Sequence, residues 1–150
     1  MSSHFLKLIP TDPCFVPPEP VWSMAAACLD LLTPKADIIE TSSSPSVQFV
    51  DPGDNFEHVR CPACASDITD WWTNAMDATA INHFTDLSAT LPCCGLITSL
   101  NDLDYKWPAG FARFTLAARN PNLGRALSLE ELDALQTILG CYLRQIFVRI

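Results

Sequence analysis

Two short cysteine-bearing stretches, Arg60-Cys61-Pro62-Ala63-Cys64 and Leu91-Pro92-Cys93-Cys94-Gly95, decide how the middle of this chain is expected to fold. Two thiolates three positions apart on a tight turn can point at one cation. The proline after the first cysteine fixes φ and helps to shape that turn. If the second stretch is aligned on its proline and glycine, Leu91 stands where the first cysteine would be. The two stretches therefore predict a single site with sulfur ligands.

These stretches resemble the knuckles of zinc-ribbon proteins, which are usually written C-P-x-C-G, with Ala65 in place of the glycine in the first. We expect one structural Zn²⁺ held by Cys61, Cys64, Cys93 and Cys94. Neighbouring side chains of a strand point to opposite faces, although in a turn both can reach one ion. Cys93 is therefore the first choice for the fourth ligand, and His83 and His58 are the alternatives.

The chain has seven cysteines, an odd number that a closed set of disulfides cannot use completely. The N-terminal sequence lacks the apolar run of a signal peptide, so we expect a cytoplasmic protein with reduced thiols. Cys14, Cys28 and Cys141 have apolar neighbours and are expected to pack as small hydrophobic side chains.

The outer parts of the chain alternate strand, helix and strand. The pattern predicts strands at 4–10, 36–40, 47–50, 111–118 and 145–150, a polar loop at 41–45, and helices at 21–33 and 129–139. Ser128 and Glu131 form a predicted capping box at the start of the last helix. Two such halves resemble the ferredoxin-like βαβ–βαβ sandwich, an α+β fold with helices on one face of an antiparallel sheet.

The run Asp51-Pro52-Gly53-Asp54-Asn55 is a strong chain breaker that marks where the cysteine-bearing segment begins. We expect a single domain over 1–150, with an α+β scaffold at 1–50 and 108–150 and an inserted zinc-binding module at 51–107. Within the module, the pattern predicts a helix at 69–84 that buries His83, and a ribbon hairpin of strands at 87–91 and 96–100.

Composition narrows the range of functions. The 150 residues include 9 Lys and Arg against 17 Asp and Glu, a formal net charge of −8. This balance argues against nucleic-acid binding, which needs basic residues to neutralise phosphates. No apolar run is long enough for a membrane span. We therefore expect a structural zinc protein that acts in protein–protein interaction or regulation through a basic or apolar protein partner. Homo-oligomerisation is left open.

The alternative function is an enzyme, either a zinc-dependent hydrolase or a Cys-x-x-Cys thiol–disulfide oxidoreductase. The zinc-protease motif His-Glu-x-x-His and the nucleobase-deaminase signature are both absent from the sequence, so no catalytic residue is assigned. Tyr105, Trp107 and Phe111 cluster near Pro108 and form either an exposed recognition patch or part of the core.

Overall fold

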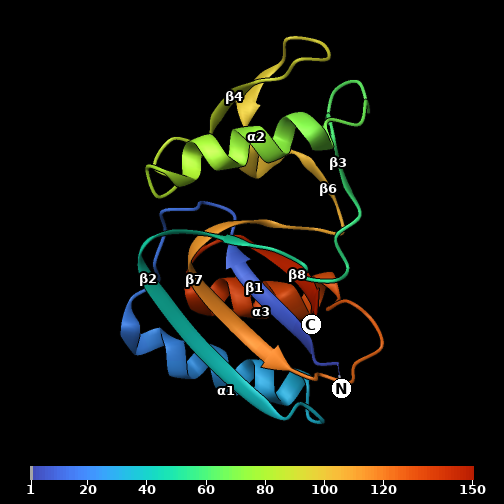
Figure 1. Ribbon diagram of the computed structural model, residues 1–150. Coiled ribbons are helices and arrows are strands. Elements are labelled where there is room, and N and C mark those ends of the chain that lie inside the picture. Colours follow the sequence, from blue (N-terminus) through green and yellow to red (C-terminus); the bar gives the residue numbers. More distant parts are fainter. Residues whose placement is uncertain (1) are drawn as a thin grey trace.

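The computed structural model describes residues 2–150 and shows a mixed α/β fold with antiparallel sheets (Figure 1). The helices of this part of the chain are α1 (Trp22–Leu32), α2 (Thr69–Ala80) and α3 (Leu129–Leu139), with short 3₁₀ turns at Glu19–Val21 and Leu100–Asp102. The strands are β1 (His4–Pro10), β2 (Ile38–Val50), β3 (His58–Arg60), β4 (Ser88–Thr90), β5 (Ile97–Ser99), β6 (Asp104–Lys106), β7 (Gly110–Arg119) and β8 (Leu143–Arg149).

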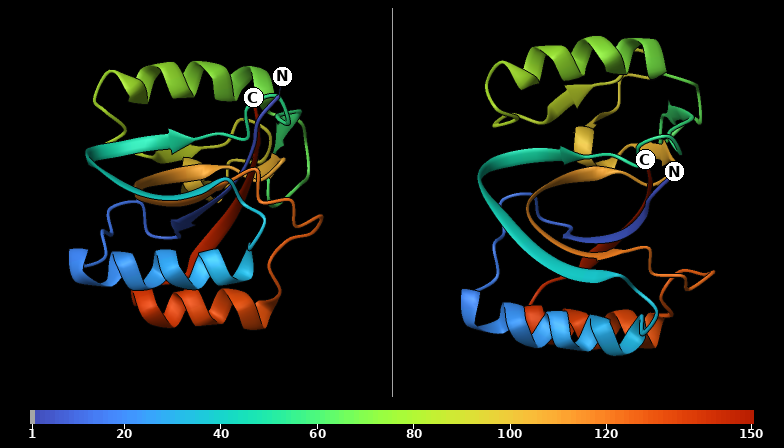
Figure 2. Two further views of the ribbon diagram at one scale, coloured as in Figure 1. Left: turned by 90° about the horizontal axis from the view of Figure 1, so that it is seen from below. Right: turned by 60° about the horizontal axis from the view of Figure 1, so that its bottom comes forward.

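The largest sheet has four strands in the order β2-β7-β1-β8, and every neighbouring pair is antiparallel. Helices α1 and α3 lie side by side against one face of this sheet (Figure 2). Their buried residues, Ala25 and Leu29 in α1 and Leu135 and Leu139 in α3, are spaced four apart, which keeps them on one helix face. They pack into one core cluster with alternate residues of β1 and β7, which are Leu6, Leu8, Phe114, Leu116 and Ala118.

Both scaffold helices agree with the sequence prediction, and α3 shows why its ends are sharp. The Ser128 hydroxyl accepts a hydrogen bond from the Glu131 N–H, and the Glu131 carboxylate accepts one from the Ser128 N–H, so the capping box is confirmed. Gly140 ends the helix at φ 74°, a left-handed conformation that glycine adopts without steric cost.

The prediction of a loop at 41–45 is wrong, because β2 continues through these residues as a single strand. Thr41, Ser42 and Ser43 pair in register with β7, and the register shifts only between Ser43 and Gln48. Strand β2 lies at the edge of the sheet, where polar side chains are solvated and a proline such as Pro45 at an irregularity costs no ladder bond. Composition alone therefore suggested a break where tertiary pairing maintains the strand.

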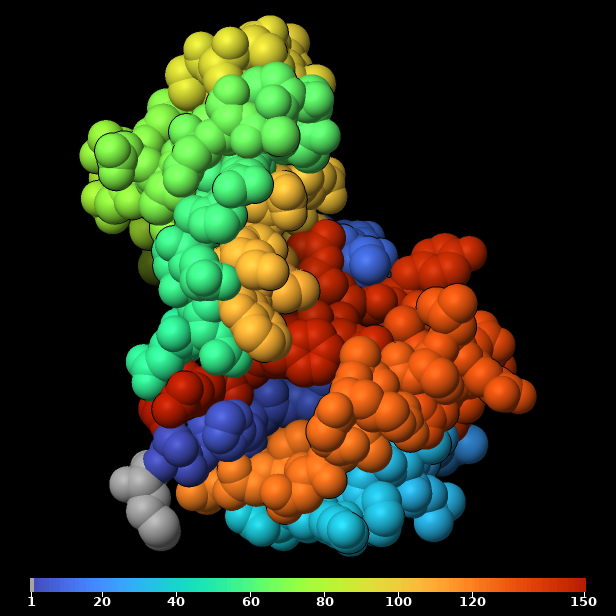
Figure 3. Space-filling view, turned by 90° about the vertical axis from the view of Figure 1, so that its right-hand side faces the viewer, coloured from blue at the N-terminus to red at the C-terminus, as the bar shows by residue number. Residues whose placement is uncertain are grey.

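The cysteine-bearing segment forms a separate head above the sheet, opposite α1 and α3 (Figures 1 and 3). It contains α2 and two small antiparallel sheets, β3 with β6 and β4 with β5. The β4–β5 hairpin agrees with the prediction. Helix α2 is shorter than predicted: it ends at Ala80, and the chain then turns through His83 and Phe84, both at positive φ.

The head is attached to the sheet by an apolar cluster that includes aromatic residues from both parts. Phe111 of β7 lies 5.1 Å from Phe49 of β2 and 5.5 Å from Phe84, measured between ring centroids. Phe49 also contacts Trp72 of α2, and the Trp72 indole donates a hydrogen bond to the Tyr105 hydroxyl. These contacts fix the base of the head, and with it the position of the cysteine turns.

No helix within residues 2–150 is long and apolar enough to cross a membrane.

Candidate metal centre

Four cysteines from the two quoted stretches come together at the far end of the head. The Sγ atoms of Cys61, Cys64, Cys93 and Cys94 all lie within 4.8 Å of one another. The Cys61–Cys94 distance is 3.7 Å and the Cys93–Cys94 distance is 3.9 Å. A disulfide has an S–S distance of about 2.05 Å, so these are four separate thiols. The group could hold a metal ion.

The two cysteine turns have the same backbone hydrogen bonds. In the first, Cys61 donates its N–H to Ser66 and accepts from the Ala65 N–H, at 2.9 and 3.0 Å. In the second, Leu91 donates to Leu96 and accepts from Gly95, again at 2.9 and 3.0 Å. Ala65 and Gly95 both have positive φ, 63° and 74°. Leu91 is thus the structural counterpart of Cys61, as the alignment on proline and glycine predicted.

The first turn is built to hold a thiolate. The backbone N–H groups of Ala63 and Cys64 both point at Cys61 Sγ, each at 3.4 Å. The hydrogen bond from the Cys64 N–H is the main cause that lowers the pKa of Cys61. Cys64 Sγ lies 3.2 Å from Ser66 Oγ, and hydrogen bonding with the Ser66 side chain and backbone lowers the pKa of Cys64 to about 6.

In the second turn, the pKa of both sulfurs is raised. Although Cys93 is exposed as a residue, local desolvation and hydrogen bonds with Cys64 and Cys61 raise its pKa to about 12. The Leu96 backbone acts to lower the pKa of Cys94, but the hydrogen bond with Cys61 and desolvation outweigh it, so that this pKa is raised. A cation that binds all four sulfurs needs them as thiolates, so its binding releases protons.

The site is anchored on one side and open on the other. Cys61 is only 1% exposed and belongs to the core cluster of the head with Val59, Ile68 and Leu91. The remaining three cysteines are exposed. A bound ion would therefore lie at the surface, and the two turns would be fixed to the core through Cys61 and Leu91.

Neither histidine that was considered as a fourth ligand belongs to this group. His83 is exposed in the turn after α2, and the prediction that it is buried in the core is wrong because the helix ends before it. His58 lies in β3 and lines a cleft of about 620 Å³ beside the cysteines, with Cys93, Glu57, Asp67 and Asp70. The fourth sulfur of the cluster comes from Cys93.

Asn101 is a structural residue that sequence reasoning did not identify. Its side chain is 4% exposed; Oδ1 accepts the Phe111 N–H at 2.9 Å and Nδ2 donates to the Thr11 carbonyl at 3.0 Å. Arg144 also reaches Asn101 Oδ1, at 3.2 Å. Asn101 therefore links the end of the cysteine-bearing segment to the scaffold, and no local pattern marks such a role.

Of the three aromatic residues near Pro108, two belong to the core and one is exposed. Tyr105 and Phe111 are buried, and the Tyr105 hydroxyl donates to the Leu100 carbonyl at 2.6 Å. Trp107 is 41% exposed and meets Phe147 edge-on.

Comparison of the chain with protein families, with curated proteins and with solved structures gives no match.

Proposed function

We propose that Cys61, Cys64, Cys93 and Cys94 bind one Zn²⁺ that stabilises the head, and that the head serves protein–protein interaction or regulation. The observation that carries the proposal is the convergence of four unlinked sulfurs from two turns with matching hydrogen bonds. Within residues 2–150, no disulfide and no ion pair joins the two cysteine turns, which are distant in sequence.

The sulfur separations suit a tetrahedral ion. Zn–S bonds of about 2.3 Å place the sulfurs of a regular tetrahedron about 3.8 Å apart. The separations of 3.7 and 3.9 Å that Cys94 makes with Cys61 and Cys93 agree with this value. Four thiolate ligands leave no open position for water, which favours a structural site over a catalytic one.

Zinc and iron both accept four thiolates in this geometry. We favour zinc because the two cysteine turns resemble the knuckles of zinc ribbons.

The same proposal extends to the fold. We assign the scaffold to the ferredoxin-like arrangement, because its strand order β2-β7-β1-β8, its antiparallel pairs and its two helices on one face fit two βαβ halves. We assign the head to a zinc-ribbon-like module, on the evidence of its two knuckle turns and the β4–β5 hairpin.

Charge supports a basic partner for the head. Residues 51–107 carry nine of the seventeen acidic residues and two of the nine basic ones, so a formal −7 of the −8 lies there. Four thiolates around Zn²⁺ would add −2 to this surface. Such a surface attracts a positively charged protein segment and repels nucleic acid.

Metal analysis of the purified protein tests the metal site. We expect one zinc per chain, no visible absorption from iron, and loss of the metal in Cys61→Ser and Cys64→Ser. Cys28→Ser and Cys14→Ser are matched controls, because neither sulfur belongs to the cluster. An unchanged zinc content in Cys61→Ser would overturn the assignment. A reversible Cys61–Cys64 disulfide in metal-free native protein would favour the oxidoreductase.

The partner class is tested with an oligolysine peptide as the probe. Replacing Glu57, Asp70 and Asp77, all exposed carboxylates of the head, by their amides should weaken peptide binding. The same change at Glu19, Asp30 and Asp133 of the scaffold removes equal charge and should have little effect. Equal losses in the two triple variants would show that net charge, and not the head, attracts the peptide.

A further inference from the structure

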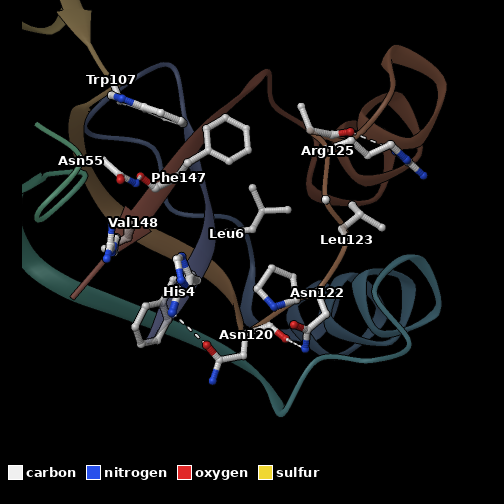
Figure 4. Close-up of a pocket in the computed structure, with 15 residues that line it drawn as sticks. His4, Leu6, Asn55, Trp107, Asn120, Asn122, Leu123, Arg125, Phe147 and Val148 are labelled. Atoms are coloured by element: carbon white, nitrogen blue, oxygen red, sulfur yellow. Dashed lines mark hydrogen bonds between the residues drawn. The ribbon is translucent and has the colours of Figure 1, made fainter. Parts of the chain in front are cut away.

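A second site is present on the scaffold, away from the cysteines. It is a cavity of about 540 Å³ at the start of β1 and the end of β8 (Figure 4). This volume is within the usual range of small-molecule pockets. The segment Asn120–Ala126, which connects β7 to α3, forms one wall, and Trp107 and Asn55 form the other. No residue of α1 or α3 lines it, so this part of the sheet is covered by a loop instead of a helix.

The floor of the cavity has an apolar part and a cationic part. Leu6 pairs with Phe147 and His4 pairs with Arg149 across the β1–β8 ladder, so all four side chains share one face of the sheet. Leu6 and Phe147 belong to the scaffold core cluster, and Leu123 adds an apolar side chain from the loop. His4 and Arg149 lie next to this surface, at the strand ends.

Charge in the cavity is opposite to that of the rest of the protein. Of the lining residues that the structure describes, none is Asp or Glu, although the chain carries a net charge of −8. Arg125 is bound to Glu131 at 2.6 Å and is therefore neutralised. Arg149 has no carboxylate within salt-bridge distance in the described part of the chain. A ligand with one negative charge is thus matched by one available guanidinium.

The walls are held in place before any ligand arrives. Asn120 accepts the His4 N–H at 2.9 Å and donates to Asp37 at 2.8 Å, while Gln145 exchanges hydrogen bonds with both backbone groups of Leu127. Asn120 and Asn122 both have positive φ, a left-handed conformation that asparagine tolerates better than most residues with a side chain. The loop is therefore fixed at both ends around the cavity.

An aromatic surface completes the site. The Trp107 and Phe147 rings meet at 69° with centroids 6.4 Å apart, and Trp107, which lines the cavity, is 41% exposed. An aromatic ring placed over Leu6 can pack against this pair in the edge-to-face geometry that aromatic groups prefer.

We propose that this cavity binds a small aromatic carboxylate, with its ring on Leu6, Phe147 and Trp107 and its carboxylate at Arg149 and His4. None of the four clustered cysteines lines this cavity, although Trp107 and Asn55 come from the segment that carries them.

Titration with naphthylacetate and its neutral analogue naphthylethanol, followed by heteronuclear NMR, tests the proposal. The acid should shift the backbone amides of 120–126 and 147–149, and it should bind about fivefold more tightly than the alcohol, the gain expected from one exposed charge pair. Equal affinity for the two probes, shifts confined to other regions, or no shifts at millimolar acid would each overturn it.

Variants separate the two parts of the site. Arg149→Gln should reduce the affinity for the acid to that for the alcohol, and it should leave the affinity for the alcohol unchanged. Its backbone bonds with Pro52 and Asp54 do not involve the side chain, so the fold is kept. Trp107→Ala should weaken both probes about tenfold. Lys35→Gln removes an equal charge outside the cavity and should change the affinity for neither probe. If Lys35→Gln weakens acid binding as much as Arg149→Gln does, only the net charge of the protein matters.

Discussion

Replacing Asn101 by alanine is expected to lower the free energy of unfolding by about 2–4 kcal/mol. The Asn101 side chain accepts the Phe111 N–H at a buried position and donates to the Thr11 carbonyl. In the variant the Phe111 N–H loses its partner where water cannot replace it, which costs about 1–3 kcal/mol. The lost bond to Thr11 adds a smaller amount, because Thr11 is exposed and can bind water.

Urea unfolding measured by circular dichroism gives the magnitude, and hydrogen exchange at the Phe111 amide gives the location. Asn101→Asp keeps the acceptor for Phe111 and for Arg144 but places a carboxylate oxygen against the Thr11 carbonyl at a buried position, so it should also destabilise the protein. Asn74→Ala changes an exposed asparagine of α2 and should alter stability by no more than about 0.5 kcal/mol. A change below about 1 kcal/mol in Asn101→Ala would refute the role of the buried acceptor.

Three further predictions follow from local geometry. Cys93→Ala should lower metal affinity, and adding Leu91→Cys should restore it, because Leu91 is the counterpart of Cys61. Competition with a chelator measures the metal affinity of both variants. If the double variant does not recover affinity, the two turns are not equivalent. Glu131→Gln should destabilise the protein at neutral pH. Hydrogen bonds from Arg125 and Ser128 lower the pKa of Glu131 from 4.5 to about 2. The stabilisation by ionised Glu131 is therefore present above pH 4.5 and declines as the pH falls toward 2. The stabilities of the wild-type protein and of Glu131→Gln, measured by unfolding, should converge in that pH window. Gly53→Ala should cost about 1–3 kcal/mol in thermal unfolding, since Gly53 has φ 63° and a Cβ there would collide with the Arg149 carbonyl; a neutral result would show that this turn can relax.

Most elements of the scaffold could be predicted because their signals are local. The capping residues Ser128 and Glu131 lie three apart and act on one turn, so the start of α3 needs no distant partner. The cysteine turns were equally predictable: proline and cysteine recur at matching positions in both stretches, and Ala65 takes the positive φ that Gly95 has in the second. The loop predicted at 41–45 failed because serine and proline indicate a break by composition, while pairing with β7 determines the conformation.

By itself, the sequence determined which residues carry sulfur, where α1 and α3 lie, and how charge divides between head and scaffold. Only the tertiary structure decided that Cys93 and not His83 joins the other three sulfurs, and that Arg149 lies beside an apolar cavity. The physical reason is that helix caps and turns depend on bonds between residues a few positions apart. A site depends instead on distances between side chains from separate elements, and these are set by packing, as Asn101 and Phe111 set the position of the head.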